Sequence, residues 1–302
     1  MEKLVGIILG IISAVAYGTN PLFGVKLLRD GVSVDAMLFW RFAGAALLLA
    51  PAAYCAAGNL KISARDIPAL ATLGALFAVS AHSLFAAFEI IPAGIASTML
   101  FLYPVFVALI MSIFFGEKPK ATTIIAIIMS LAGVAFLYAD DANFEGLNIK
   151  GALLVIISAL TYAFYIVIVK VSRVSAMDGV KLAFYAIVFA AFAAFAKCAL
   201  DGNLSLPQNS FETLNAFGLV VFPTALSIVA ISYSIKYAGA TIAALLGAFE
   251  PVTAVSISFA LLGEKFSLYI GIGIALILSA TIIITLSASQ SAFRRGMQKN
   301  SA

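Results

Sequence analysis

The sequence predicts an all-α polytopic membrane protein, in which ten transmembrane helices form two inverted repeats of five helices. Three observations support this prediction: an apolar composition, ten apolar stretches between polar segments, and a motif that recurs at a fixed distance. Of the 302 residues, 63% are hydrophobic and 11% are charged, with a mean hydropathy of +1.11. Because so few polar residues cannot cover a water-soluble globule, lipid must be the main solvent of this chain.

The apolar stretches have the length that a membrane requires. A hydrocarbon layer about 30 Å thick is crossed by roughly 20 apolar residues in a helix. The third and fourth stretches are separated only by a short turn at Pro92, and the eighth and ninth only by Gly239. The ten predicted spans cover residues 4–25, 34–56, 67–89, 93–115, 121–139, 149–170, 179–200, 214–236, 240–262 and 267–288.

Lys and Arg residues predict the orientation, because basic residues near span ends are retained on the cytoplasmic side. With the amino terminus inside, twelve lie on the cytoplasmic side: Lys3, Lys61, Arg65, Lys118, Lys120, Lys170, Arg173, Lys181, Lys236, Arg294, Arg295 and Lys299. Five lie on the opposite side: Lys26, Arg29, Lys150, Lys197 and Lys265. We therefore expect both termini in the cytoplasm and the chain in a bacterial inner membrane. The net charge of +4 then reflects topology and gives no indication of nucleic-acid binding.

A motif in the first stretch recurs in the sixth, 145 residues later. Gly6, Ile11-Ile12-Ser13-Ala14 and Tyr17 match Gly151, Ile156-Ile157-Ser158-Ala159 and Tyr162. After a slip of two residues, Pro104-Val105 matches Pro251-Val252, and Gly116-Glu117-Lys118 matches Gly263-Glu264-Lys265. The repeats run over residues 1–139 and 148–288, and residues 289–302 form a cytoplasmic tail. Since five spans is an odd number, the second repeat enters the membrane from the opposite side, the arrangement that secondary transporters use for alternating access.

Two segments at the ends of the repeats resemble a known family. Glu250-Pro251-Val252 through Leu261-Leu262-Gly263-Glu264-Lys265, and Tyr103-Pro104-Val105 through Phe115-Gly116-Glu117-Lys118, resemble the EamA-like family of the drug/metabolite transporter superfamily. Trp40-Arg41-Phe42 is similar to the aromatic-Arg pair in the second span of that family. The resemblance implies a basket-shaped helical fold and transport of amino acids, related metabolites or toxic analogues, without selecting one substrate.

Polar groups deep in the spans are the first candidates for a substrate site, because they are costly in hydrocarbon and face protein or a water-filled cavity. Glu250 precedes Pro251, so it would bind a proton or a cation, or else pair with Arg41 or Lys236. Arg41 would bind a substrate carboxylate or extend its side chain to the interface. His82, the single histidine, would hydrogen-bond across a helix contact or titrate during transport.

Aromatic side chains and Asn20 complete the predicted site. Tyr17 and Asn20 share one face of the first span, and Tyr162 and Tyr165 share one face of its repeat mate, the sixth. These faces would line a cavity that stacks on an apolar ligand and hydrogen-bonds its polar part. Packing or an interfacial position is the other interpretation for each tyrosine. The remaining members of the predicted wall are Phe85, Tyr103 (the repeat counterpart of Glu250) and Tyr233.

Several prolines fall inside predicted spans, where the missing N–H creates a kink or a polar notch. We predict hinges or kinks at Pro21, Pro104, Pro223 and Pro251. Small-residue stripes such as Gly271, Ala275 and Ser279 favour close helix packing and leave open a homodimer.

The sequence excludes several other classes of protein. One histidine, two separated cysteines and the absence of an HExxH motif argue against an enzyme, a bound metal or a cofactor. Without a P-loop, the chain by itself is not an ATP-driven pump. We predict a secondary transporter of amino acids or related amphipathic or zwitterionic metabolites, with protons as a candidate coupling ion and export as a candidate direction. The alternative is an uncoupled facilitator or a channel-like pore.

Overall fold

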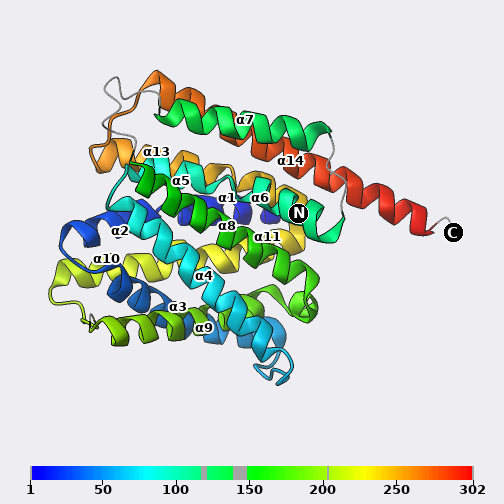
Figure 1. Ribbon diagram of the computed structural model, residues 1–302. Helices are drawn as coiled ribbons and strands as arrows, with labels where there is room; N and C mark the ends of the chain where they lie inside the picture. Colours follow the sequence, from blue (N-terminus) through cyan, green and yellow to red (C-terminus); the bar gives the residue numbers. More distant parts are fainter. Residues whose placement is uncertain (1, 117–120, 139–147, 203, 301–302) are drawn as a thin grey trace.

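The computed structural model describes residues 2–116, 121–138, 148–202 and 204–300, and the fold is helical throughout that part of the chain (Figure 1). Eight helical segments are long and apolar enough to cross a membrane, and two shorter apolar helices, Ala121–Leu137 and Leu268–Ile283, lie at the ends of the repeats. This confirms the predicted all-α fold with two repeats of five helices. The acidic loop at Asp140, Asp141 and Glu145, and the repeat residues Glu117 and Lys118, lie outside the described residues.

The observed helices follow the predicted spans within a few residues. The first repeat consists of α1 (Glu2–Tyr17) and α2 (Asn20–Arg29) in span 1, α3 (Val34–Ala57), α4 (Ile67–Phe88), α5 (Ala93–Leu100) and α6 (Tyr103–Phe115) in span 4, and α7 (Ala121–Tyr138). The second consists of α8 (Ile149–Val171), α9 (Gly179–Asp201), α10 (Ser210–Val220) and α11 (Ser227–Ala238) in span 8, α12 (Ala240–Leu246) and α13 (Phe249–Leu261) in span 9, and α14 (Leu268–Asn300). The last helix therefore continues beyond the predicted end of span 10.

The packing of the helices shows the inverted symmetry directly. α1 packs on α11 and α4 on α8, so span 1 meets span 8 as span 3 meets span 6. Each contact is centred on a serine pair: the hydroxyls of Ser13 and Ser227 lie 3.1 Å apart, and those of Ser80 and Ser158 also 3.1 Å apart. α3 pairs with α9 at one edge of the bundle and α7 with α14 at the opposite edge, and the other spans lie between them (Figure 1).

Glycines allow span 1 to approach the second repeat closely. A Cβ atom on Gly6 would lie 2.6 Å from the backbone nitrogen of Ala238, and one on Gly18 would lie 2.6 Å from the carbonyl oxygen of Glu250. The small residues of span 1 therefore serve contacts within the chain.

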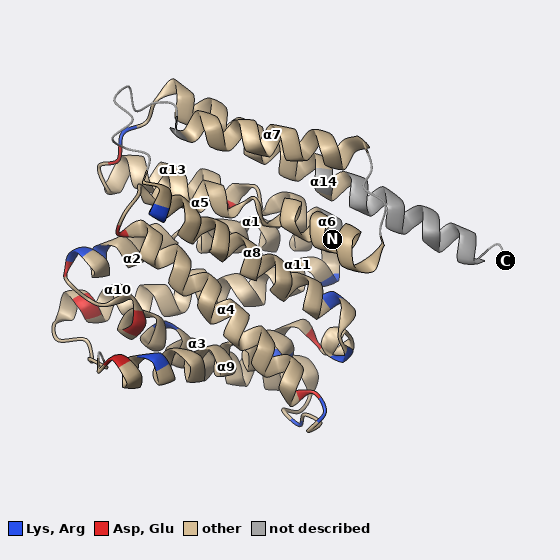
Figure 2. Cartoon of the chain, in the orientation of Figure 1, with Lys and Arg blue, Asp and Glu red and all other residues tan. Residues whose placement is uncertain are grey.

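The two ends of the bundle differ in packing. We call them the Asp35 end, which carries Asp35, Ala93 and Leu261, and the amino-terminal end, which carries Glu2, Ala57 and Ala238. At the Asp35 end, α5 packs on α13, and all but one of the eight α5 residues are buried. Their repeat mates at the amino-terminal end, α12 and α6, make far less contact with each other within the described residues. Lys, Arg, Asp and Glu gather at both ends, whereas most of the helix length is neither acidic nor basic (Figure 2).

Candidate functional site

Four spans are interrupted near the middle of the membrane. Span 1 breaks at Gly18-Thr19, span 4 at Phe101-Leu102 and span 9 at Gly247-Ala248, and span 8 contains a π-helical turn over Val221–Leu226. Pro21, Pro104 and Pro251 lie two or three residues after these breaks, and Pro223 lies inside the π turn. Such breaks leave backbone polar groups free at mid-membrane depth, which transporters tolerate where the backbone is buried in protein or lines a cavity.

Charged and aromatic side chains from different spans converge at these breaks. The hydroxyl of Tyr17 experiences the charges of both Arg41 and Glu250. Tyr103 lies within electrostatic reach of Glu250 and Tyr17, and Tyr162 within reach of all three groups. Residues predicted separately in spans 1, 2, 4, 6 and 9 therefore share one region of the protein.

The tyrosines of this region contact one another through their rings. The centroids of Tyr103 and Tyr162 lie 5.0 Å apart edge to face, and those of Tyr162 and Tyr165 lie 5.9 Å apart in a stacked arrangement. We call Tyr17, Tyr103, Tyr162 and Tyr165 the tyrosine cluster. Each of its members, like Glu250, is half-buried.

Arg41 is buried and does not extend to the interface, since only 2% of its surface is exposed. Its Nε donates a hydrogen bond of 2.8 Å to Oγ1 of Thr224, and its guanidinium carbon lies 5.8 Å and 5.5 Å from the ring centroids of Phe42 and Phe85. Its Nη2 has no hydrogen-bond partner. Since Phe85 is fully buried, it supports Arg41 and does not line an accessible wall, which corrects the predicted role of this residue.

Asn20 is also buried, with 4% of its surface exposed. Its Nδ2 donates to the carbonyl oxygen of Tyr17 at 2.8 Å, so the side chain bridges the break in span 1. Its Oδ1 has no partner. The site thus contains an unpaired buried donor on Arg41 and an unpaired buried acceptor on Asn20, although buried polar groups normally find partners.

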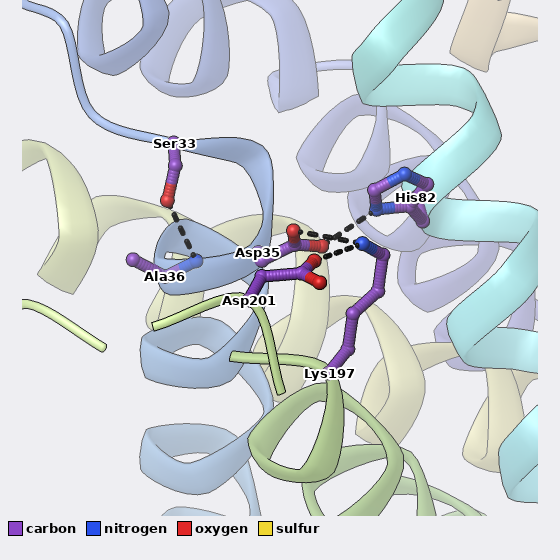
Figure 3. Close-up of polar contacts among 6 residues, drawn as sticks. All are labelled: Ser33, Asp35, Ala36, His82, Lys197 and Asp201. Carbon is purple, nitrogen blue, oxygen red and sulfur yellow. Dashed lines mark hydrogen bonds and ion pairs between the residues drawn. The ribbon is translucent and has the colours of Figure 1, made fainter. Parts of the chain in front are cut away.

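His82 lies in a separate cluster, shown in Figure 3. Its Nδ1 lies 2.9 Å from Oδ1 of Asp35, without the alignment of a good hydrogen bond, and Oδ2 of Asp35 lies 3.1 Å from Nζ of Lys197. The same Nζ lies 2.7 Å from Asp201. We call Asp35, His82, Lys197 and Asp201 the Asp35 network; it joins α3 and α4 of the first repeat to α9 of the second.

Tyr233 and Lys236 also lie apart from the tyrosine cluster. Nζ of Lys236 lies 5.8 Å and 5.9 Å from the ring centroids of Tyr233 and Tyr237. Glu250 forms no ion pair with Lys236 or Arg41, all three of which are among the described residues. The carboxyl group of Glu250 therefore keeps its capacity to bind a proton or a ligand.

Sequence reasoning missed Thr224, Asp35 and Lys197. Thr224 carried no signal beyond its proximity to Pro223, and Asp35 and Lys197 lie near span ends, where charged residues are ordinary. A carboxylate in the first turn of one span and a lysine in the last turns of another give a weak signal for an ion pair.

Within the described residues, no group of three His, Cys, Asp or Glu side chains could hold a metal ion, and both Cys55 and Cys198 are free thiols.

Two inverted repeats with polar groups at broken mid-spans define a membrane transport protein. The sequence profile of the EamA-like transporter family matches residues 4–139 and 149–286. The chain belongs to the EamA-like transporter family, which confirms the resemblance predicted from the sequence.

The curated relatives extend over nearly the same length. An uncharacterized transporter of Archaeoglobus fulgidus is 27% identical over 90% of this chain and 93% of its own length. An uncharacterized transporter of Clostridium kluyveri is 26% identical over 92% of both chains. A solved crystal structure with 20% sequence identity aligns with a TM-score of 0.68 over 95% of this chain and 99% of that chain, which supports the fold alone.

Proposed function

We propose that this protein is a secondary transporter of small zwitterionic, partly apolar metabolites, with amino acids as the first candidates, and that it works by alternating access. The observation that carries this proposal is that buried Arg41 has an unpaired Nη2 and that Glu250, which forms no ion pair, packs against the break that follows Tyr17. Opposite charges that flank one partly accessible region match a ligand with separate positive and negative groups.

Each part of such a ligand has a counterpart in the site. The free Nη2 of Arg41 suits a carboxylate, because the guanidinium group donates in a geometry that fits planar anions. Oδ1 of Asn20 and the carboxylate of Glu250 suit an ammonium group. The tyrosine cluster offers ring faces to an apolar side chain and hydroxyls to its polar groups.

The difference between the two ends of the bundle supports alternating access. α5 and α13 pack closely at the Asp35 end, whereas α6 and α12 make far less contact at the amino-terminal end within the described residues. The basic residues predict that the amino-terminal end faces the cytoplasm. In this orientation the substrate would reach the site from the cytoplasm, which is one of the two forms of access that alternating access requires.

Glu250 is the proposed coupling site for protons. A carboxyl group beside a helix break can bind a proton and release it when its surroundings change, and intramembrane acids commonly serve as proton relays. When Glu250 is protonated it no longer attracts the substrate ammonium group, so proton binding and substrate binding would compete.

Uptake of a labelled amino-acid panel into proteoliposomes tests this function. Wild type and Glu250→Gln are compared with and without an imposed pH gradient, and Glu89→Gln, an exposed carboxyl at the end of α4, is the matched control. We expect saturable uptake that unlabelled substrate on the opposite side accelerates, as for a carrier and not a pore. The pH gradient should drive uptake by wild type and Glu89→Gln but not by Glu250→Gln.

Other outcomes would revise the proposal in distinct ways. Equal, gradient-independent uptake by wild type and Glu250→Gln would indicate an uncoupled facilitator. Uptake that does not saturate and shows no counterflow would indicate a channel-like pore. A panel in which no amino acid is transported would remove the proposed substrate class.

A further inference from the structure

The π-helical turn in span 8 distinguishes this span from its repeat mate. Span 3 is one continuous helix, α4, whereas span 8 widens into the π turn at Val221–Leu226. In an α-helix, the N–H of residue 223 would donate to the carbonyl oxygen of Leu219, but Pro223 has no N–H. Oγ1 of Thr224 donates to this same carbonyl at 2.8 Å. Thr224 thus satisfies the acceptor that Pro223 leaves without a donor.

This hydrogen bond determines how Thr224 meets Arg41. A hydroxyl has one proton, and Thr224 donates it to Leu219, so its lone pairs remain to accept a hydrogen bond. Nε of Arg41 donates to Oγ1 of Thr224 at 2.8 Å. Thr224 is 0% exposed and Arg41 is 2% exposed, so water does not compete for either bond. The direction of the chain from Arg41 through Thr224 to Leu219 is therefore unambiguous.

Two aromatic rings contact the rest of the guanidinium group. The ring centroids of Phe42 and Phe85 lie within 5.8 Å of its central carbon. With Nε engaged by Thr224, the terminal nitrogens remain for a ligand, and Nη2 is buried and without a hydrogen-bond partner. A carboxylate would accept from this end of the group.

We propose that Thr224 is a positioning residue that orients Arg41 toward the carboxylate of the substrate and so determines selectivity for acids over their uncharged derivatives. This inference rests on the proposed function, because it takes Arg41 as the anion subsite. It adds a reason for the π turn: Pro223 frees the Leu219 carbonyl, the carbonyl fixes the Thr224 hydroxyl, and the hydroxyl fixes Arg41.

Ligand binding to the purified full chain tests the inference, with phenylalanine and phenylalanine amide as probes. The amide keeps the ammonium group and the ring but lacks the carboxylate. Thr224→Val removes the hydroxyl at nearly constant shape, Thr224→Ser retains it, and Thr72→Val is the control, because exposed Thr72 bonds only to the Pro68 carbonyl of its own helix. Substrate-induced thermal stabilisation over a concentration series measures both affinities.

We expect wild type to prefer the acid. Thr224→Val should weaken acid binding roughly tenfold, the change expected for the loss of one hydrogen bond to a charged group, and should leave amide binding within about twofold. Thr224→Ser and Thr72→Val should retain the wild-type preference. An equal loss for both probes in Thr224→Val, or a failure of Thr224→Ser to restore selectivity, would show that Thr224 is only structural.

Arg41→Gln separates this inference from the function on which it rests. If wild type prefers the acid and Arg41→Gln retains that preference, the anion subsite lies elsewhere, and both the role of Arg41 and that of Thr224 are wrong. If Arg41→Gln loses the preference and Thr224→Val keeps it, only the role of Thr224 is wrong. If wild type binds neither probe, the proposed substrate class fails, and the inference fails with it.

Discussion

The Asp35 end and the amino-terminal end are built from repeat-equivalent elements but are held together differently. At the Asp35 end, the carboxylate of Glu264 accepts hydrogen bonds from the backbone N–H groups of Ala93 at 2.6 Å and Gly94 at 3.0 Å, and so joins the second repeat to the start of α5. Nη2 of Arg29 adds a bond of 3.0 Å to the carbonyl of Leu262. At the other end, the contact between α6 and α12 is much smaller within the described residues. Similar sequences thus adopt different packing when one end of the bundle must be sealed.

Spans 2 and 7 show no such difference between the ends, because α9 contacts α3 at one end and the loop that follows α3 at the other. Lys197 contacts Asp35 at the Asp35 end. At the amino-terminal end, Nζ of Lys181 donates to the carbonyl of Lys61 at 2.8 Å, and the hydroxyl of Tyr185 donates to the carbonyl of Leu60. The comparison indicates that α3 and α9 form a fixed pair and that the difference between the ends arises in spans 4 and 9.

A disulfide between α5 and α13 gives the largest expected effect. A Cβ on Gly94 would lie 3.2 Å from Cβ of Ser258, close to the separation of about 3.8 Å in disulfides. In a background with Cys55→Ser and Cys198→Ser, we expect oxidised Gly94→Cys/Ser258→Cys to lose nearly all transport, because the Asp35 end can no longer open. Reduction should restore it, and the two single-cysteine variants should not respond to oxidant. Full transport by the cross-linked protein would mean that this contact persists throughout the cycle.

Removal of the Glu264 carboxylate should loosen the closed end. Glu264→Ala leaves two backbone N–H groups without their acceptor, at a cost of about 1–3 kcal/mol for each group that stays unpaired. The reporter is Ser97→Cys, at a buried position in α5. We expect an impermeant maleimide to label this cysteine about tenfold faster in the Glu264→Ala variant than in the parent protein that retains Glu264. Glu89→Ala, which removes an exposed carboxyl at the same end, should leave the labelling rate unchanged.

The Asp35 network should contribute less, because exposed ion pairs are worth about 0–1 kcal/mol. The side chain of Asp35 is 12% exposed and contacts two basic groups, whereas that of Lys197 is 46% exposed and keeps Asp201 as a partner. We expect Asp35→Asn to raise Ser97→Cys labelling about threefold and Lys197→Met less than twofold. The double variant Asp35→Asn/Lys197→Met should raise the rate no further than Asp35→Asn alone, because both changes remove the same ion pair. If the effects of the two single changes add, this pair does not hold the end closed.

The spans and the repeats could be predicted from the sequence because both depend on patterns that the sequence itself shows. The thickness of the hydrocarbon layer sets the length of each apolar stretch, so the boundaries of α3, α4 and α9 agree with prediction within one residue. Pro21, Pro104, Pro223 and Pro251 indicated where spans 1, 4, 8 and 9 would be interrupted, because a missing N–H removes a bond from the backbone ladder.

The candidate site was predicted in parts. Depth in a span was enough to select Arg41, Glu250 and the tyrosines, because polar groups are costly in hydrocarbon and at that depth face protein or a water-filled cavity. It could not show that Phe85 packs beneath Arg41, or that His82 meets Asp35 and not the tyrosine cluster. Thr224 was missed because its role depends on Arg41, which lies 183 residues earlier in the chain.

By itself, the sequence determined that this chain is a helical membrane protein of two related halves and belongs to a family of transporters. The tertiary structure alone decided which residues share a site and which end of the bundle is closed. Periodicity and hydropathy are properties of each span by itself. The partners of Arg41 and Asp35, and the contact of α5 with α13, depend on how the two halves pack, and the repeated sequence is compatible with closure at either end.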